Sequence, residues 1–109
     1  MANTTVTWTG RTGQRYVYEV LNMNTNWNKV AGNYIFASRN GASWHAIYIG
    51  QTNNFAERLP GHEALGCATR NGATHIHAHV NGNEAARIQE EQDLIEGHNP
   101  TCNKLLKTG

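Results

Sequence analysis

The sequence is poor in several features that would define a class of protein. Only two cysteines, Cys67 and Cys102, occur in 109 residues, too few for a disulfide framework, so we expect a reducing, cytoplasmic compartment. No apolar run approaches the roughly 20 residues of a membrane span, and the first 20 residues are too polar for a signal peptide. Charged residues make up 16% and hydrophobic residues 39%, which fits neither a coiled coil nor a disordered chain. The sequence therefore predicts one small globular domain without a membrane partner.

A large excess of one charge is also missing. Nine Lys and Arg residues face eight Asp and Glu residues, for a net charge of +1. The distribution is uneven, because residues 1–83 hold six basic and three acidic residues and residues 84–109 hold three and five. A surface that binds a polyanion is therefore expected on the first part of the chain.

Four segments have the composition of strands. Residues 15–20 alternate well enough for a short strand, after a loose arm over residues 1–13. Residues 34–37 and 44–49 are rich in β-branched and aromatic side chains, and Asn40-Gly41 between them favours a hairpin turn. A further strand is expected over residues 74–80, where Asn-Gly pairs stand on both sides.

Two segments carry helix signals. Asn54 can cap a short helix over residues 55–59, which Pro60-Gly61 should end. Asn83 can cap a longer helix that ends between Gly97 and Pro100. The order of these elements predicts an α+β domain, in which a three-stranded central sheet is flanked by helices and the N-terminal residues add a strand or an arm.

On a helical wheel of the last helix, one acidic side chain falls among the apolar ones. Glu91 lies in the arc of Ile88, Leu94 and Ile95, whereas the wheel places the other acids between Glu90 and Glu96 on the polar side. A carboxylate that faces a core is costly unless it is paired or bound to a metal ion. Glu91 is therefore either satisfied by an arginine or backbone donors, or it is a ligand for Mg²⁺ or another hard cation.

Two short motifs, Gly32-Asn33-Tyr34 and Tyr48-Ile49-Gly50, stand in two of the predicted strands. A turn and helix over residues 51–58 follow and end in Arg58, and His62 and Glu91 come later in the chain. In this order the residues resemble the GIY-YIG nuclease family, whose name comes from the two strand motifs, over residues 32–103 or about two-thirds of the chain. Asn33 replaces the usual apolar middle residue, and we expect its side chain to point away from the face that carries Tyr34.

The resemblance implies an enzyme, a divalent-metal-dependent endonuclease that cleaves DNA to 5′-phosphate and 3′-hydroxyl ends. Tyr34 would orient and deprotonate the attacking water, and Tyr48 would support it. Arg58 would bind the phosphate oxygens, which suits the fork of a guanidinium. His62 would contact a tyrosine or the phosphate. Glu91 would hold one Mg²⁺ or Mn²⁺ ion per active site.

Further residues are expected around this set. By the resemblance, Asn103 and Gly50 would support the site, and Arg39, Asn53 and Arg70 are candidates for contact with DNA.

The resemblance also divides the chain. Residues 1–31 form an arm or strand packed on the domain, residues 32–103 the nuclease core and residues 104–109 a C-terminal tail. The substrate is left open among single-stranded, duplex and branched DNA. Because little chain lies outside the core, specificity would come from DNA structure, a homodimer or a protein partner.

The residues also leave alternatives open. His75, His77 and His79 project from one face of their strand, and two of them could share a Zn²⁺ ion, although a solvated or DNA-facing surface is favoured. The two cysteines are either buried apolar residues or a metal pair with His98. The alternatives to a nuclease are a non-catalytic nucleic-acid-binding module of the same fold and a zinc-binding interaction protein built on the histidine strand.

Overall fold

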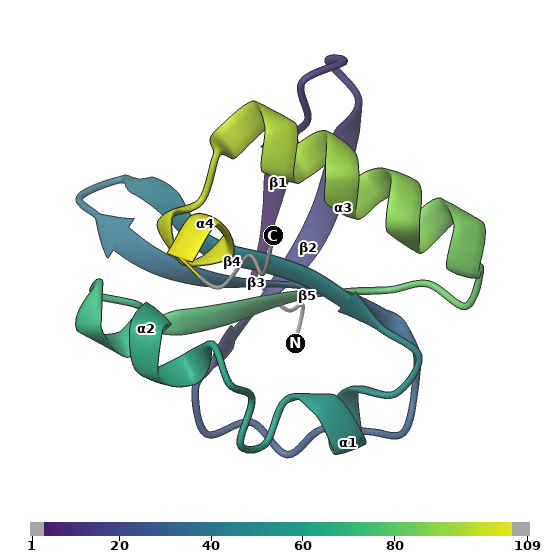
Figure 1. The fold of residues 1–109 in the computed structure, drawn as a ribbon, viewed down its shortest axis with the longest axis horizontal. Coiled ribbons are helices and arrows are strands. Elements are labelled where there is room, and N and C mark those ends of the chain that lie inside the picture. The colour runs from purple at the N-terminus through teal and green to yellow at the C-terminus, as the bar shows by residue number, and fades with distance from the viewer. Residues whose placement is uncertain (1–3, 106–109) are drawn as a thin grey trace.

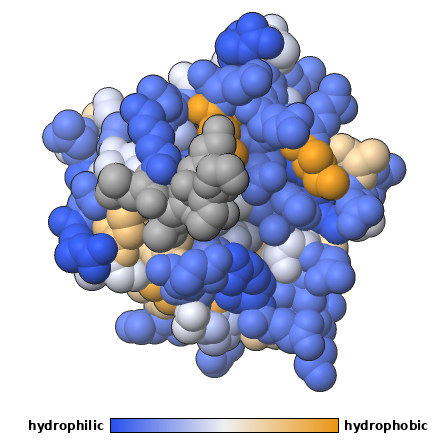
Figure 2. Space-filling model, viewed as in Figure 1, coloured by the Kyte–Doolittle hydropathy of each residue, from blue (hydrophilic) through white to orange (hydrophobic). Residues whose placement is uncertain are grey.

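The structure is a computed structural model that describes residues 4–105. A curled antiparallel sheet lies between helices, with α3 across one face and α1 and α2 on the other (Figure 1). The elements are β1 (Thr5–Thr9), β2 (Arg15–Asn22), β3 (Gly32–Asn40), β4 (Ser43–Thr52), α1 (Phe55–Arg58), α2 (Leu65–Arg70), β5 (His75–Val80), α3 (Glu84–His98) and α4 (Thr101–Leu105). In the view of Figure 2 the surface of the described residues is mainly hydrophilic, with small and separate apolar areas.

The sheet has five strands in the order β1-β2-β5-β3-β4, so the α+β prediction is confirmed but the predicted number of three strands is wrong. The predicted hairpin of β3 and β4 and the predicted strand β5 are present. The two additional strands come from the N-terminal part, because β2 pairs with β5 and β1 pairs with β2. Residues 5–9, which the sequence favoured as a loose arm, thus form an edge strand. Residues 1–3 of that arm and residues 106–109 of the tail lie outside the described residues.

Alternation along the strands gives the sheet two different faces. Tyr34 and Phe36 lie on the face covered by α1 and α2, which we call the α1 face. Ile35 and Ala37 lie on the opposite face with Leu94 of α3, which we call the α3 face. Each face has its own cluster of buried apolar side chains, so β3 is buried on both sides.

The predicted helix boundaries are confirmed. The Asn54 side chain accepts a hydrogen bond from the backbone N–H of Glu57, and α1 ends before Pro60. The Asn83 side chain accepts one from Ala86, and α3 ends at Asn99 in the left-handed conformation. Helices α2 and α4 are short, and neither a strong capping residue nor an apolar periodicity predicts them from the sequence.

The helical wheel is wrong about which acids of α3 are buried. Glu90 and Asp93 are 4% and 7% exposed, while Ile88 is 40% exposed. The N-terminal hairpin supplies the reason, because the hydroxyl of Tyr18 donates to Glu90 at 2.6 Å and that of Tyr16 donates to Asp93 at 2.8 Å. Apolar patterning alone could not reveal these partners.

The three histidines of β5 lie on the α3 face, so the prediction of a solvated or DNA-facing surface is wrong. His77 is fully buried and its Nδ1 accepts a hydrogen bond from the indole of Trp8 at 2.9 Å. His79 Nδ1 lies 2.9 Å from a carboxylate oxygen of Glu90. Among residues 4–105 no group of three or more His, Cys, Asp or Glu side chains is placed to hold a metal ion, which leaves the zinc-binding alternative without a ligand set.

The two cysteines are buried in the apolar cluster of the α1 face, as one of the two alternatives predicted, but they form a disulfide that joins α2 to α4, so the alternative of a metal pair is wrong. They are 35 positions apart, and only the packing of α4 beside α2 brings them together. His98, the third member of the predicted metal site, instead places its Nε2 atom 2.8 Å from the carbonyl oxygen of Thr9. Counting cysteines therefore gives no argument for a reducing compartment. No helix of the described chain is long and apolar enough to cross a membrane.

Candidate active site

Two tyrosines stand side by side on the α1 face where β3 pairs with β4. Phe36 pairs with Tyr48, and Tyr34 pairs with Gly50, so both hydroxyl-bearing side chains project from the same face. The rings of Tyr34 and Tyr48 are stacked with centroids 6.3 Å apart. Tyr34 is buried and Tyr48 is half-buried, so only Tyr48 presents a substantial surface to solvent.

Gly50 makes room for the ring of Tyr34. A Cβ atom at Gly50 would lie 2.5 Å from both the Oη and the Cζ atoms of Tyr34, closer than non-bonded carbon and oxygen atoms approach one another. A side chain at position 50 would therefore push Tyr34 out of its place. This contact gives a physical reason for a glycine in the second motif.

His62 contacts the hydroxyl of Tyr34. The Oη atom of Tyr34 and the Nε2 atom of His62 are 2.7 Å apart, and the backbone N–H of Ala64 donates to His62 Nδ1 at 2.9 Å. Since Nδ1 accepts, a neutral ring carries its proton on Nε2, and this Nε2–H donates a hydrogen bond to the Tyr34 hydroxyl. Burial, together with the positive charge of Arg58, lowers the pKa of His62 to about 4, so the ring is neutral at physiological pH.

The turn after α1 places His62 in this contact. The backbone N–H of His62 donates to the carbonyl of Leu59 at 3.2 Å, and Gly61 has a φ of 71°. A left-handed residue of this kind is the natural place for glycine. The Pro60-Gly61 pair thus ends the helix and turns the chain so that His62 reaches the tyrosines.

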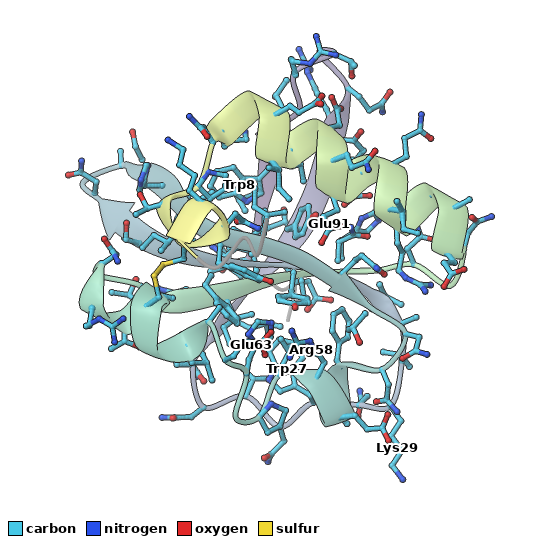
Figure 3. All side chains as sticks on the ribbon, viewed as in Figure 1. Trp8, Trp27, Lys29, Arg58, Glu63 and Glu91 are labelled. Carbon is cyan, nitrogen blue, oxygen red and sulfur yellow. A yellow bond between two sulfur atoms is a disulfide. The ribbon has the colours of Figure 1, made fainter. Side chains whose placement is uncertain are left out.

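Arg58 is engaged by a neighbouring acid that the sequence did not single out. Its Nη1 and Nη2 atoms donate to the two carboxylate oxygens of Glu63 at 2.6 and 2.5 Å, and Figure 3 shows the two side chains together below the sheet. The hydrogen bonds from Arg58 hold the pKa of Glu63 at about 2. No spacing rule predicts this pair, because the turn between α1 and α2 creates it.

Both tyrosines are held as neutral phenols. Burial raises the pKa of Tyr34 and of Tyr48, and the positive charge of Arg58 opposes that rise at both positions. Further positive charge in the site would therefore favour the phenolate.

Glu91 projects from α3 toward the sheet (Figure 3). Its half-buried carboxylate accepts a hydrogen bond from the backbone N–H of Gln51, and burial raises its pKa. Because Gln51 follows Gly50, the carboxylate lies at the end of β4 that carries the contact with Tyr34. A carboxylate with part of its surface open is a suitable donor for a hydrated Mg²⁺ or Mn²⁺ ion, which takes most of its ligands from water and substrate. The donor chemistry therefore fits a single hard cation.

Arg87 is a positioning residue that the sequence did not reveal. It is 3% exposed, its Nε atom donates to the Gln51 side chain at 3.1 Å, and its Nη1 atom donates to the carbonyl of Asn81 at 3.1 Å. Its own carbonyl accepts from the amide of Asn33 at 2.9 Å, so Asn33 points to the α3 face, as its alternation with Tyr34 predicted. One turn before Glu91, this arginine fixes α3 against the end of β4. The sequence feature that could have singled it out is its position as an arginine within an acidic helix.

The side chain of Asn103 hydrogen-bonds to backbone groups at the edge of β4 that no described strand pairs with. Its Oδ1 atom accepts from the backbone N–H of Ile49 at 2.8 Å, and its Nδ2 atom donates to the carbonyl of Ile49 at 2.9 Å. The side-chain amide thus replaces one residue of a missing neighbouring strand, between Tyr48 and Gly50. This geometry is compatible with the supporting role implied for Asn103.

The three candidate DNA contacts do not gather in one place. Asn53 is exposed in the turn that leads to α1, beside the site. Arg39 lies at the far end of β3, five residues from Tyr34 and therefore about 17 Å along the strand, with its guanidinium 5.3 Å from the ring of Trp44. Arg70 is exposed at the end of α2.

These features define a small α+β domain with a tyrosine–histidine pair, a forked arginine and a helix carboxylate at one end of its sheet. The chain has a GIY-YIG fold. It is similar to two solved tyrosine point mutants of the GIY-YIG N-terminal endonuclease domain of UvrC from Thermotoga maritima, each bound to its catalytic divalent cation. Both similarities have a TM-score of 0.58 and cover 71% of this chain and 86% of that domain, with 26% and 24% identity. No protein-family model and no curated protein sequence match the chain.

Proposed function

We propose that the protein is a metal-dependent endonuclease that hydrolyses DNA phosphodiester bonds to 5′-phosphate and 3′-hydroxyl ends. The observation that carries this proposal is the 2.7 Å contact between Tyr34 and a neutral His62, in the site that also holds Arg58. The similarity to endonuclease domains with a catalytic divalent cation supports it.

Tyr34 is the proposed base toward the attacking water. The Nε2–H of His62 donates to Tyr34 Oη, so His62 cannot take the phenol proton but does stabilise a phenolate by that hydrogen bond. Tyr34 would first lose its phenol proton to solvent, and the positive charge of Arg58 favours the phenolate that remains. Tyr34 would then accept a proton from the water as the oxygen attacks phosphorus.

Arg58 would hold the phosphate through its two parallel N–H groups, which match a pair of phosphate oxygens. The Tyr48 side chain is half-buried beside Tyr34, and its hydroxyl would orient the water or a phosphate oxygen. Asn53, Arg39 and Arg70 are proposed to contact DNA outside the reacting phosphate.

Glu91 would hold the single Mg²⁺ or Mn²⁺ ion. The cation, when bound, stabilises negative charge on the phosphate and on the leaving 3′-oxygen. The hydrogen bond from the backbone of Gln51 to Glu91 and the contacts of Arg87 with the same strand end would keep the carboxylate in place.

In this proposal residues 32–103 form the nuclease core, and the β1–β2 hairpin completes its sheet. DNA is the proposed partner, in single-stranded, duplex or branched form. A second copy of the chain or another protein would add specificity.

Labelled single-stranded, duplex and branched DNA incubated with Mg²⁺ or Mn²⁺ tests the proposal. We expect cleavage by the wild-type protein, at least a hundredfold less by Tyr34→Phe, Arg58→Gln and Glu91→Gln, and none in the presence of a chelator. Cleavage that survives in Glu91→Gln at the wild-type rate would contradict the proposed metal site, and absence of cleavage on every substrate would contradict the nuclease.

One observation favours the alternative of a non-catalytic nucleic-acid-binding module. In the free protein Arg58 is already engaged by a carboxylate, as it could remain in a protein that does no chemistry on phosphate. This alternative predicts salt-sensitive binding of DNA without turnover on any substrate.

A further inference from the structure

Glu63 occupies the position at Arg58 that a phosphate needs. Its two carboxylate oxygens accept from Nη1 and Nη2 of Arg58 in a fork-to-fork arrangement. A phosphate group binds a guanidinium with the same pair of parallel hydrogen bonds. A carboxylate and a phosphate therefore compete for one side of one guanidinium.

The pair is open to exchange. The Arg58 and Glu63 side chains are 36% and 61% exposed, so solvent screens the attraction between them, although the bidentate geometry makes the pair stronger than a single surface contact. Besides its hydrogen bonds with Arg58, the Glu63 carboxylate accepts one from its own backbone N–H, and its Oε2 atom lies 3.8 Å from His62 Nδ1. His62 Nδ1 already accepts from Ala64, so a neutral His62 offers Glu63 no hydrogen bond there. Among the side chains that the structure describes, Arg58 is therefore the one that holds the carboxylate by hydrogen bonds.

We propose that Glu63 is an internal competitor of the substrate, a carboxylate that occupies the phosphate-binding side of Arg58 and must leave before a DNA phosphate binds. The inference rests on the proposed function, since it identifies which group of the free protein stands in for the phosphate. Each binding event then includes the displacement of Glu63, which lowers the apparent affinity by the fraction of molecules in which Arg58 is free. The chemical step follows displacement, so it is the same with or without Glu63.

The matched test compares Glu63→Gln with Glu57→Gln. Glu57 is an exposed residue of α1, and among the described residues no hydrogen bond or ion pair joins its side chain to that of Arg58. Both substitutions remove one negative charge from the same region, so a general electrostatic effect on DNA affinity is common to both. Only Glu63→Gln removes the negative fork from Arg58.

Dissociation constants for a fluorescent DNA oligonucleotide are measured by anisotropy in EDTA, over a series of salt concentrations. We expect Glu63→Gln to lower the dissociation constant two- to fivefold beyond the effect of Glu57→Gln, as follows from the loss of one exposed ion pair. The salt dependence should steepen by up to one phosphate contact. Equal effects of the two substitutions, or weaker binding by Glu63→Gln, would overturn the proposal.

Two further measurements separate competition from a positioning role. With Arg58→Gln as background, Glu63→Gln should have no effect beyond that of Glu57→Gln. In cleavage assays Glu63→Gln should lower KM and leave kcat within about twofold, because catalysis follows displacement. A fall in kcat with unchanged KM would show instead that Glu63 orients Arg58, and the proposal would be wrong.

The binding assay does not depend on cleavage. Tighter DNA binding by Glu63→Gln in a protein that cuts no DNA would support the role of Glu63 as a competitor and contradict the proposed nuclease activity. Cleavage of DNA together with equal DNA affinities of Glu63→Gln and Glu57→Gln would support the nuclease activity and contradict the role of Glu63 as a competitor.

Discussion

The disulfide between Cys67 and Cys102 should contribute a large part of the stability of this small domain. It closes a loop between positions 35 apart, and the loop-closure entropy of an unfolded chain of that length corresponds to about 4 kcal/mol. For a domain of about 100 residues such a loss lowers the Tm by about 15 °C or more. The perturbation is reduction by dithiothreitol, or the double substitution Cys67→Ala and Cys102→Ala.

The assay is urea unfolding of the oxidised and the reduced protein at neutral pH. The double variant should unfold at least as easily as reduced wild type, since it also lacks two buried sulfur atoms, and dithiothreitol should not change it further. Hydrogen exchange adds a local readout, because α4 carries Asn103 next to Cys102. Reduction should therefore accelerate exchange of the Ile49 amide before it affects the rest of the sheet.

Two results would refute this reasoning. Titration of two free thiols in protein purified without reductant would show that the bond does not form. Unfolding curves that agree within about 0.5 kcal/mol before and after reduction would show that the cross-link does not restrict the unfolded chain as the entropy argument requires.

Three further predictions concern the site and the buried histidines. Gly50→Ala should cost about 1–3 kcal/mol by overpacking against Tyr34 and abolish cleavage, whereas a wild-type Tm would contradict the contact. Asn103→Ala should cost about 1–3 kcal/mol by leaving the edge groups of β4 unpaired, measured by urea unfolding; a change below about 0.5 kcal/mol would contradict that role. Burial lowers the pKa of His62 and of His77 to about 4, below the ordinary 6.5, so the unfolded state takes up protons first. The free energy of unfolding should therefore fall between pH 6.5 and pH 4, by about 1–2 kcal/mol per pH unit, and His77→Gln should reduce that slope; a slope unchanged by His77→Gln would contradict the assignment.

Local signals account for the elements that the sequence predicted well. Asn40-Gly41 fixes the β3–β4 hairpin, and Asn54 and Asn83 begin helices where their side chains cap them. The order of motifs along the chain likewise named Tyr34 and His62, which the structure brings within 2.7 Å of each other.

What the sequence could not show depends on contacts between distant residues. The burial of Glu90 follows from the hydroxyl of Tyr18, 72 positions earlier, so no wheel of α3 alone could place it. The pairing of Cys67 with Cys102 and the joining of β2 to β5 are also non-local. The engagement of Arg58 by Glu63 is local but depends on a turn whose geometry the sequence did not specify.

The central position of β5 determines the order in which the chain can fold. Each hairpin, β1–β2 and β3–β4, joins neighbouring segments and can form early, but no described strand pair links one hairpin to the other except through β5. During synthesis the two hairpins are therefore not joined in one sheet, and their edges stay open, until His75–Val80 has left the ribosome. Insertion of β5 is then the step that turns two marginal hairpins into one sheet, and α3 closes over it from the next residues of the chain.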